Sequence, residues 1–314
     1  MTKIAFIFPG QGSQAVGMGA ELVQINEGNK AFYDKADEKL GFALSTLMLE
    51  GPAEELTFTY NAQPALLTTS TMVSELLQAA GVKPDYTIGH SLGEYSALVA
   101  SGVLAFEDGV QIVHERGLFM NEAVPAGLGA MAAILGLDAE ALKAVTDRVT
   151  EQGDVVQLAN LNCPGQIVIS GTKSGVEKAC EKAKEAGAKR AIPLVVSGPF
   201  HSELMRPAAS NLGKALNELD MHNTDVPVIS NVTANPVTYA EEMKELLVQQ
   251  LYSPVRFEES IRTLLNLGVD TFIECGPGKV LSGLVKKIDR SARIYAAYDQ
   301  ASIEQVIEAS KEWS

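Results

Sequence analysis

The chain has few cysteines and no long hydrophobic run, and these shortages exclude several classes of protein. Among its 314 residues there are three cysteines, Cys163, Cys180 and Cys275. They lie far apart without a C-x-x-C pair, so we expect no disulfide framework and no metal site, and a reducing cytoplasm fits best. The apolar run 4–8 near the amino terminus is too short for a signal peptide or a membrane span, so we expect a buried strand there and no membrane contact.

The chain also has fewer basic than acidic residues. The chain has 25 Lys and Arg against 39 Asp and Glu, a formal net charge of −14 at pH 7. Such a field repels phosphate backbones, so we expect no nucleic-acid partner. With 46% hydrophobic and 20% charged residues the composition is globular, which excludes a disordered or collagen-like chain. The length corresponds to about two domains at roughly 150 residues each.

The hydrophobic pattern predicts an α/β fold. Short apolar runs at 4–8, 86–88 and 269–273 are each followed by a glycine and a helix-like stretch. This order is typical of parallel strands that helices cover on both faces. Amphipathic segments at 65–77 and 108–123 supply candidate covering helices.

The segment 127–197 has a pattern of strands and helices that differs from that of the rest of the chain. It predicts, in order, a strand at 129–135, a helix at 139–150, strands at 155–160 and 166–170, a helix at 176–186 and a strand at 188–196. The order β-α-β-β-α-β is that of a ferredoxin-like unit. We therefore expect a small domain, 127–197, inserted into a parallel-sheet α/β core formed by 1–126 and 198–314.

The pentapeptide GHSLG at 89–93 matches the G-x-S-x-G pattern of a nucleophile elbow. A strand at 85–88 precedes it and a small-residue helix at 94–100 follows, which is the context that this turn requires. We therefore expect the hydroxyl of Ser91 to project over the sheet edge, with the backbone N–H of Leu92 near the position of an oxyanion. The alternative is a serine in an ordinary tight turn.

Four histidines could supply a base for Ser91: His90, His114, His201 and His222. Adjacent residues on a turn diverge, so His90 is expected to pack or to form hydrogen bonds instead. His114 falls within a helix, and His222 lies in a polar connection. His201 follows a strand and a turn, where α/β folds collect catalytic groups. On the residues alone, His201 is a candidate base, with a structural role equally open.

Arg116 lies in the predicted helix 108–123 and has two interpretations. A mid-helix arginine ordinarily points to water or pairs with a nearby acid such as Glu115 or Glu122, and periodicity favours that interpretation. The functional alternative is a guanidinium that holds a substrate carboxylate through two parallel hydrogen bonds.

Two glycine-rich turns invite a nucleotide-binding interpretation, which the context disfavours. The segment 10–15 spells G-x-G-x-x-A, but the second strand and acidic residue of a dinucleotide site are missing, since 31–40 looks helical. The segment 276–279 lacks the spacing of a phosphate-binding loop and is interpreted as a strand-to-helix turn.

Together these segments resemble the acyltransferase family of bacterial malonyl-CoA:acyl carrier protein transacylases and polyketide synthase acyltransferase domains. The resemblance runs over essentially the whole chain. Its marks are FPGQGSQ at 8–14, QPA at 63–65, GHSLGE at 89–94, RG at 116–117, NLN at 160–162, GPFHS at 198–202, QLY at 250–252 and ECGPG at 274–278. The family fold, an α/β-hydrolase-like core with a ferredoxin-like insertion, agrees with the organisation inferred above.

The resemblance implies a role for each reacting residue. Ser91 would be the acylated nucleophile and His201 its base. The main-chain carbonyl near Gln250 would orient the other ring nitrogen of the histidine. The backbone amides of Gln11 and Leu92 would form the oxyanion hole.

The resemblance also implies the substrates. Malonyl would pass from malonyl-CoA to the phosphopantetheine thiol of acyl carrier protein through a malonyl-serine, supplying fatty acid synthesis, without a cofactor beyond the coenzyme A thioester itself. Arg116 would grip the free carboxylate of the malonyl group. Phe200 resembles the aromatic residue that related enzymes use to crowd out a branched acyl group, with core packing as the alternative.

An acidic carrier requires a local positive patch on this acidic enzyme. Basic residues that could form one are Lys279, Lys286, Lys287 and Arg290, together with Lys189 and Arg190. Solvated lysines on a helix face are the alternative interpretation.

Two other functions compete with acyl transfer. A serine esterase or thioesterase of the α/β-hydrolase type would need an HGGG-like loop and a histidine near the carboxyl terminus, and it would leave Arg116 without a purpose. A non-catalytic module that binds coenzyme A or acyl carriers would need neither Ser91 nor His201.

Overall fold

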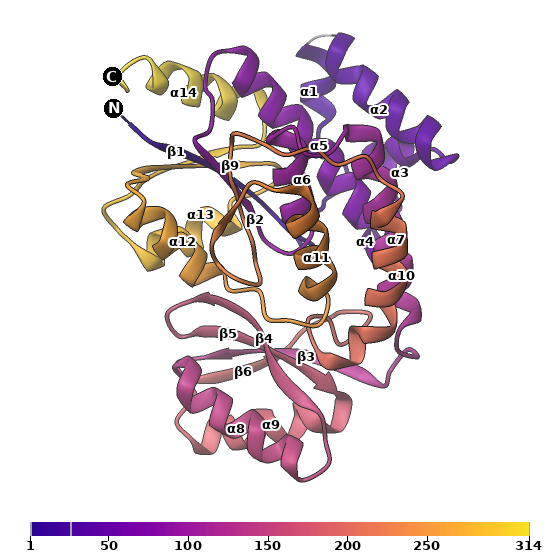
Figure 1. The fold of residues 1–314 in the computed structure, drawn as a ribbon, viewed down its shortest axis with the longest axis vertical. Coiled ribbons are helices and arrows are strands. Elements are labelled where there is room, and N and C mark those ends of the chain that lie inside the picture. Colours follow the sequence, from indigo (N-terminus) through magenta and orange to yellow (C-terminus); the bar gives the residue numbers. More distant parts are fainter. Residues whose placement is uncertain (1, 26, 314) are drawn as a thin grey trace.

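The computed structural model describes residues 2–25 and 27–313, and their strands lie in two separate sheets (Figure 1). Within these residues the larger sheet has the strand order β10-β9-β1-β2-β7-β8. Its strands are β1 (Ile4–Phe8), β2 (Tyr86–Gly89), β7 (Val228–Ile229), β8 (Pro236–Val237), β9 (Thr271–Cys275) and β10 (Arg293–Ala297). All pairs are parallel except β7 with β8, so the expected α/β fold with a mainly parallel sheet is confirmed.

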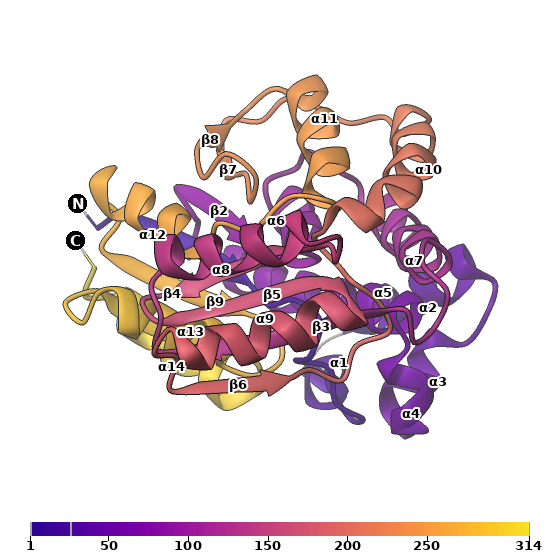
Figure 2. The ribbon, with the colours of Figure 1, turned by 90° about the horizontal axis from the view of Figure 1, so that it is seen from below.

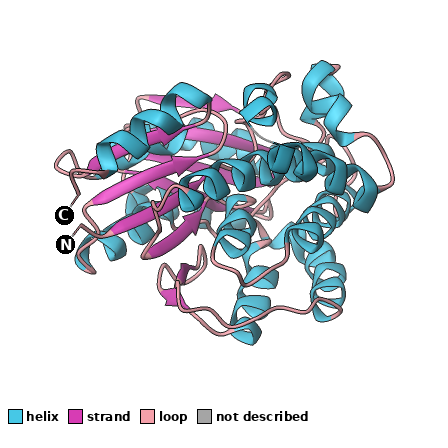
Figure 3. Ribbon diagram, turned by 90° about the horizontal axis from the view of Figure 1, so that it is seen from above, coloured by secondary structure: helices cyan, strands magenta, loops and turns pink. Residues whose placement is uncertain are grey.

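Helices cover both faces of this sheet, as Figure 3 shows. The helices before the second sheet are α1 (Ala20–Ile25), α2 (Glu27–Leu40), α3 (Leu44–Glu50), α4 (Ala53–Thr57), α5 (Thr59–Ala79), α6 (Gly93–Ala100) and α7 (Phe106–Glu122). Those after it are α10 (Arg206–Asn217), α11 (Ala240–Gln250), α12 (Phe257–Asn266), α13 (Val280–Ile288) and α14 (Gln300–Ser310), with a short 3₁₀ helix at Glu203–Met205.

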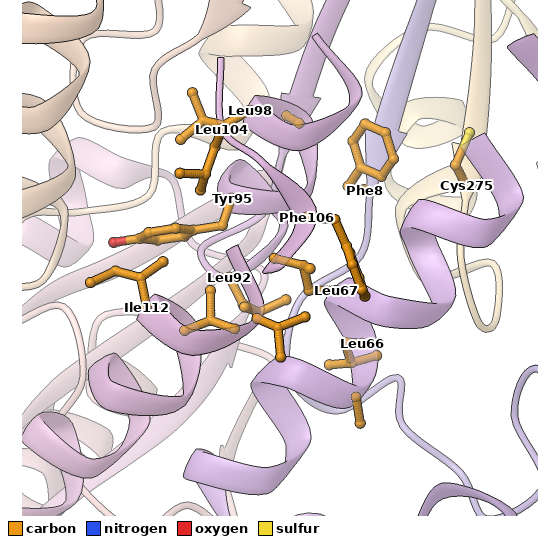
Figure 4. Packing of buried hydrophobic residues seen from close by; sticks show 14 of the residues in the cluster. Phe8, Leu66, Leu67, Leu92, Tyr95, Leu98, Leu104, Phe106, Ile112 and Cys275 are labelled. Atoms are coloured by element: carbon orange, nitrogen blue, oxygen red, sulfur yellow. The ribbon is translucent and has the colours of Figure 1, made fainter. Parts of the chain in front are cut away.

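Strand β1 lies in the middle of the sheet and is buried on both faces, which explains why its sequence is uniformly apolar. Successive side chains of a strand point to opposite faces. Phe6 and Phe8 accordingly pack into the hydrophobic cluster on one face, whereas Ala5 and Ile7 pack into the cluster on the other. Figure 4 shows part of the first cluster, to which β1 contributes Phe8, α5 contributes Leu66 and Leu67, and α6 contributes Tyr95 and Leu98.

Strand β9 begins two residues later than the 269–273 expected from the sequence. Gly268 ends α12 with a φ of +89°, and the backbone N–H of Val269 donates back to the carbonyl of Leu264. This is a helix C-cap, in which the residue after the glycine commonly makes a hydrophobic contact. Val269 is therefore buried as part of the cap, and the strand starts after it.

The second sheet carries the β-α-β-β-α-β order expected for 127–197. Its elements are β3 (Gly129–Leu135), α8 (Ala139–Glu151), β4 (Val156–Cys163), β5 (Gln166–Thr172), α9 (Lys173–Glu185) and β6 (Arg190–Pro193). The strand order is β4-β5-β3-β6, with every pair antiparallel. Helices α8 and α9 both lie on one face of this sheet (Figure 2).

Two boundaries in this sheet differ from the sequence expectation for physical reasons. Helix α9 begins before 176 because the Thr172 side chain accepts a hydrogen bond from the backbone of Gly175 and caps the helix. The expected strand 188–196 shortens to β6, because the chain leaves the sheet after Leu194, whose backbone N–H still donates to the carbonyl of Met131 on β3. The freed residue Val195 is fully exposed, although it is apolar.

The second sheet joins the core through β4. The backbone N–H of Leu161 donates to the carbonyl of Val255, and the N–H of Val255 donates to the carbonyl of Ala159. The amide of Gln157 donates to the main-chain carbonyls of His201 and Tyr252. These contacts hold the second sheet against the core next to His201.

Candidate active site

Ser91 lies on a turn that only small flanking residues permit. It connects β2 to α6 with a φ of +52°, a left-handed conformation that L-residues rarely adopt. A Cβ built on Gly89 would lie 1.7 Å from the backbone carbon of Gly93, and one built on Gly93 would lie 2.1 Å from the carbonyl oxygen of Phe8. The two glycines of G-x-S-x-G are therefore required sterically, and the expected nucleophile elbow is present.

Of the four histidines, His201 is the one that contacts Ser91 in the structure. The Nε2 atom of His201 lies 2.8 Å from Ser91 Oγ, and its Nδ1 atom lies 2.8 Å from the main-chain carbonyl oxygen of Gln250. A carbonyl oxygen only accepts, so Nδ1 carries the proton and Nε2 is free to accept the serine proton. Like Ser91, His201 has a left-handed φ, +58°.

The environment keeps this imidazole neutral. Burial, followed by the positive charge of Arg116, lowers the pKa of His201 to about 3. At neutral pH the side chain is therefore unprotonated and can act as a base.

The other three histidines have ordinary roles. His90 Nε2 lies 2.7 Å from Asn162 Oδ1, and its ring packs at 5.6 Å from the ring of Phe257. His114 Nδ1 lies 2.6 Å from a main-chain carbonyl oxygen on α5. His222 is exposed. The interpretation of His90 as a packing and hydrogen-bonding residue is confirmed.

Arg116 does not point to solvent, and the interpretation that periodicity favoured was wrong. Only 1% of the residue is exposed. Its NH1 donates to Gln63 Oε1 at 2.7 Å, and its NH2 donates to Gln250 Oε1 at 2.8 Å and to Ser91 Oγ at 3.0 Å. Glu115, one of the acids considered as its partner, instead accepts from Gln111. The tertiary packing of α7 against α5 overrides the periodicity of an isolated helix.

The guanidinium of Arg116 is a buried cation without an anion in contact. Its partners are neutral oxygens, no ion pair of Arg116 is found within residues 2–25 and 27–313, and its Nε has no hydrogen-bond partner. The ring of Tyr95 lies 5.4 Å from its Cζ, which adds a cation–π contact. Burying an unpaired charge is costly, and an incoming carboxylate would relieve that cost. The arrangement is suited to an anionic substrate.

A cavity of about 190 Å³ opens over these groups. The sequence-predicted residues that line it are Gln11, Ser91, Leu92, Arg116, Phe200 and His201. Gln11 follows β1, and its side chain is held by a 3.1 Å hydrogen bond to Thr59 Oγ1. Leu92 immediately precedes α6, at the positive end of the helix dipole. Phe200 is buried against the core and also borders the cavity, so the packing and pocket interpretations both describe it.

Sequence reasoning missed three buried polar residues that hold the site together. Gln63 accepts from Arg116, Asn231 accepts from the backbone N–H of Ser91 at 2.8 Å, and Glu94 accepts from Asn231 and Gln250. Gln63 and Glu94 fall within the quoted motifs, but no role was attached to them. Asn231 lies two residues after the end of the short buried strand β7, and a polar residue just beyond the carboxyl end of a parallel strand is the signal that could have found it.

Metal-binding clusters, disulfides and membrane-spanning helices are all absent from the described residues. The described residues contain no cluster of His, Cys, Asp and Glu able to hold a metal ion. All three cysteines are free, and two of them are buried. In the same part of the chain no helix is both long and apolar enough to cross a membrane.

Comparison with known proteins gives one consistent result. The model of the acyl transferase domain family matches residues 5–307. The malonyl CoA-acyl carrier protein transacylase of Bacillus subtilis is 65% identical over 99% of this chain and 98% of its own. That of Staphylococcus aureus is 44% identical over 100% and 99%.

Solved structures agree. An acyl carrier protein S-malonyltransferase from Vibrio cholerae superposes with a TM-score of 0.95 at 47% identity, covering 97% of this chain and all of its own. A malonyl-transacylase in complex with a type II polyketide acyl-carrier protein, 43% identical, gives a TM-score of 0.95 over 98% and 100%. Because the family model covers residues 5–307 and these relatives match over nearly the whole length, this chain belongs to the acyl transferase domain family.

Proposed function

We propose that this protein transfers the malonyl group of malonyl-CoA to the phosphopantetheine thiol of acyl carrier protein, as an S-malonyltransferase that supplies fatty acid synthesis in the cytoplasm. One observation carries the proposal: Ser91 Oγ is within 3.0 Å of both His201 Nε2 and Arg116 NH2. A nucleophile, its base and a cation for a free carboxylate thus meet at one atom. The names of the relatives support the same reaction.

The first half-reaction acylates the serine. His201 takes the proton of Ser91 Oγ as the oxygen attacks the thioester carbonyl of malonyl-CoA. The carbonyl becomes an oxyanion, toward which the backbone N–H groups of Gln11 and Leu92 would donate. Collapse of this intermediate breaks the carbon–sulfur bond, and His201 gives its proton to the departing thiolate, so coenzyme A leaves as the thiol and malonyl stays esterified to Ser91. Loss of one oxyanion donor typically costs about 3 kcal/mol in the barrier.

The second half-reaction reverses these steps with a different thiol. His201 takes the proton of the pantetheine thiol, which attacks the serine ester and regenerates Ser91. The histidine is oriented by the neutral carbonyl of Gln250 and not by a carboxylate, so the imidazolium gains less stabilisation. A thiolate is a much better leaving group than an amine, and weaker support of the imidazolium is therefore sufficient.

Arg116 supplies the main selectivity in this proposal. An acetyl group would leave the buried guanidinium unpaired, and sites built around a polar group can reject the analogue lacking it by about 10⁴-fold. Phe200 would add a steric term against branched acyl groups, worth only about 1–3 kcal/mol.

The organisation of the chain fits this function. We assign the larger sheet and its helices, 1–126 and 198–314, to an α/β-hydrolase-like catalytic core, and 127–197 to a ferredoxin-like small domain. The strand order β4-β5-β3-β6 and the two helices on one face support the second assignment. The substrate cavity is lined by residues of both parts, including Met131 and Asn160 of the small domain. No cofactor is required beyond the coenzyme A thioester.

Initial rates should show ping-pong kinetics if the acyl group rests on Ser91. With malonyl-CoA and acyl carrier protein varied together, double-reciprocal plots are expected to give parallel lines, because coenzyme A leaves before the carrier binds. Lines that converge would refute a covalent intermediate and indicate direct transfer between the two thiols.

Four of the basic residues considered for a positive patch, Lys279, Lys286, Lys287 and Arg290, lie on or next to α13, beside the second sheet. Lys286 and Lys287 occupy the last turn of α13 and are exposed, and Lys287 Nζ lies 3.4 Å from Gln166 Oε1 of β5. Lys279, Lys286 and Arg290 also border one surface pocket. We propose that this patch docks the acidic carrier, because local complementarity overcomes the net negative charge of the enzyme.

Charge reversal tests the patch. The variant carrying Lys286→Glu and Lys287→Glu is expected to raise the KM for acyl carrier protein several-fold, while the rate of Ser91 acylation by malonyl-CoA stays unchanged. Reversal of Lys143 and Lys182 on α8 and α9 is the matched control. An unchanged KM for the carrier would remove the patch from the account.

The esterase alternative is disfavoured by the same cavity. A buried cation beside the nucleophile serves no purpose in water attack on a neutral ester. Partition of the acyl group between water and the carrier thiol separates the two functions: transfer predicts that nearly all malonyl reaches the carrier. A non-catalytic binding module would leave Ser91 unmodified.

A further inference from the structure

A buried carboxylate lies behind the reacting groups and takes no part in the mechanism above. Glu94 is in the first turn of α6, three residues after Ser91, and only 4% of it is exposed. No ion pair of Glu94 is found among the residues that the structure describes. Burial raises its pKa to about 7. A buried carboxylate is costly unless it accepts hydrogen bonds that the surrounding structure needs.

The hydrogen bonds of Glu94 lead to both sides of the nucleophile. Its Oε2 accepts from Gln250 Nε2 at 2.8 Å and from the backbone N–H of Asn231 at 3.1 Å. The Asn231 side chain accepts from the N–H of Ser91 and donates to the carbonyl of Gly89 at 2.6 Å. Gln250 Nε2 also donates to the carbonyl of Ser91 at 3.0 Å. The carboxylate therefore supports two residues that fix the backbone of the elbow.

The same contact decides which way the Gln250 amide faces. With Nε2 turned toward Glu94, Oε1 points at Arg116 NH2 and accepts from it. A guanidinium only donates hydrogen bonds. If the Gln250 amide were rotated by 180°, its NH₂ group would face the NH2 group of Arg116, and the repulsion between these two donors would push Arg116 away from Ser91. The other acceptors on the Nε2 side are the neutral Ser91 carbonyl and, at 3.3 Å, Asn231 Oδ1. Glu94 is the nearest of the three, and its oxygen therefore accepts the shortest hydrogen bond from the Gln250 amide.

We propose that Glu94 is a positioning residue of this site, whose carboxylate oxygen orients the Gln250 amide and thereby aims Arg116 and holds the Ser91 turn. The proposal rests on the function proposed above. The position of the Glu94 oxygen, 2.8 Å from Gln250 Nε2, matters more in this proposal than the negative charge of the carboxylate.

Three substitutions separate geometry from charge. Glu94→Gln keeps an acceptor oxygen at the same distance but removes the charge. Glu94→Asp keeps the charge but withdraws it by one methylene from Gln250. Glu94→Ala removes both. Single-turnover malonylation of Ser91, the KM for malonyl-CoA and the ratio of malonyl to acetyl transfer are measured for each, with thermal unfolding to confirm folding.

Glu94→Ala should malonylate Ser91 about 100-fold more slowly, since displacement of reacting groups by about 1 Å costs this much. Its preference for malonyl over acetyl should fall as well, because Arg116 is no longer aimed. Glu94→Gln should stay within about tenfold of the natural protein in rate and preference, and Glu94→Asp should be slower than Glu94→Gln. If Glu94→Ala does not fold, the order of the other two variants decides.

Glu274 provides the matched control. It is a second fully buried glutamate, and it accepts hydrogen bonds from the backbones of Leu281 and Ser282 on α13, outside the cavity. Glu274→Gln and Glu274→Ala should lower stability without changing the malonyl-to-acetyl ratio. Glu94→Ala with normal rate and preference, or Glu94→Asp equal to or faster than Glu94→Gln, would overturn the positioning role. Failure of the natural protein itself to become malonylated would instead contradict the proposed function.

Discussion

Arg116→Ala is expected to abolish malonyl transfer while leaving acylation of Ser91 by acetyl-CoA intact. The guanidinium is the only charged group that contacts Ser91 Oγ among the described residues, since the imidazole of His201 is neutral, so its removal takes away the partner of the malonyl carboxylate. The ratio of malonyl to acetyl transfer should fall by up to about 10⁴-fold. The ratio of kcat/KM for the two donors measures this change.

Acetyl-CoA serves as the internal control for this variant, since acetylation requires an intact serine, histidine and oxyanion hole but no cation. Arg148→Ala on the exposed side of α8 is the matched arginine control, and its ratio should not change. Equal loss with both donors would show that Arg116 supports the structure and does not select the substrate.

His201→Ala is expected to lower the rate of Ser91 acylation by at least about 10⁴-fold with any donor, because removal of the base from a serine–histidine pair has effects of this size. The short contact of its Nε2 with Ser91 Oγ, and the hydrogen bond that places the ring proton on Nδ1, both identify His201 as the proton acceptor.

The exposed His222 gives the control for this substitution, since His222→Ala should acylate normally. A His201→Ala protein that folds and keeps more than a tenth of the natural rate would mean that another group accepts the serine proton.

Local sequence signals predicted the elbow because its chemistry is local. Gly89 and Gly93 are four residues apart. A Cβ on Gly89 would clash with Gly93 within the turn, and one on Gly93 would clash with Phe8 of the adjacent strand β1. The order of elements in 127–197 followed from hydrophobic periodicity for the same reason. Ends of elements shifted where a cap such as Thr172 or Gly268 intervened.

The rest of the site depends on long-range packing that no local pattern contains. Ser91 meets His201 across 110 positions of the chain, and Arg116 meets Gln250 across 134. Periodicity places Arg116 on an exposed helix face because it does not include α5, which buries that face. The family motifs, compared as a set, pointed to the pair of Ser91 and His201 before the structure did, whereas the contact of Arg116 with Gln250 was not predicted.

The central claim is that malonyl becomes esterified to Ser91, and a mass spectrum tests it most directly. After mixing with malonyl-CoA in the absence of a carrier, the intact protein should gain the mass of one malonyl group, and peptide mapping should place it on Ser91. The adduct should disappear when acyl carrier protein with its pantetheine thiol is added. An unmodified protein that nevertheless transfers malonyl, or an adduct on another residue, would contradict the account.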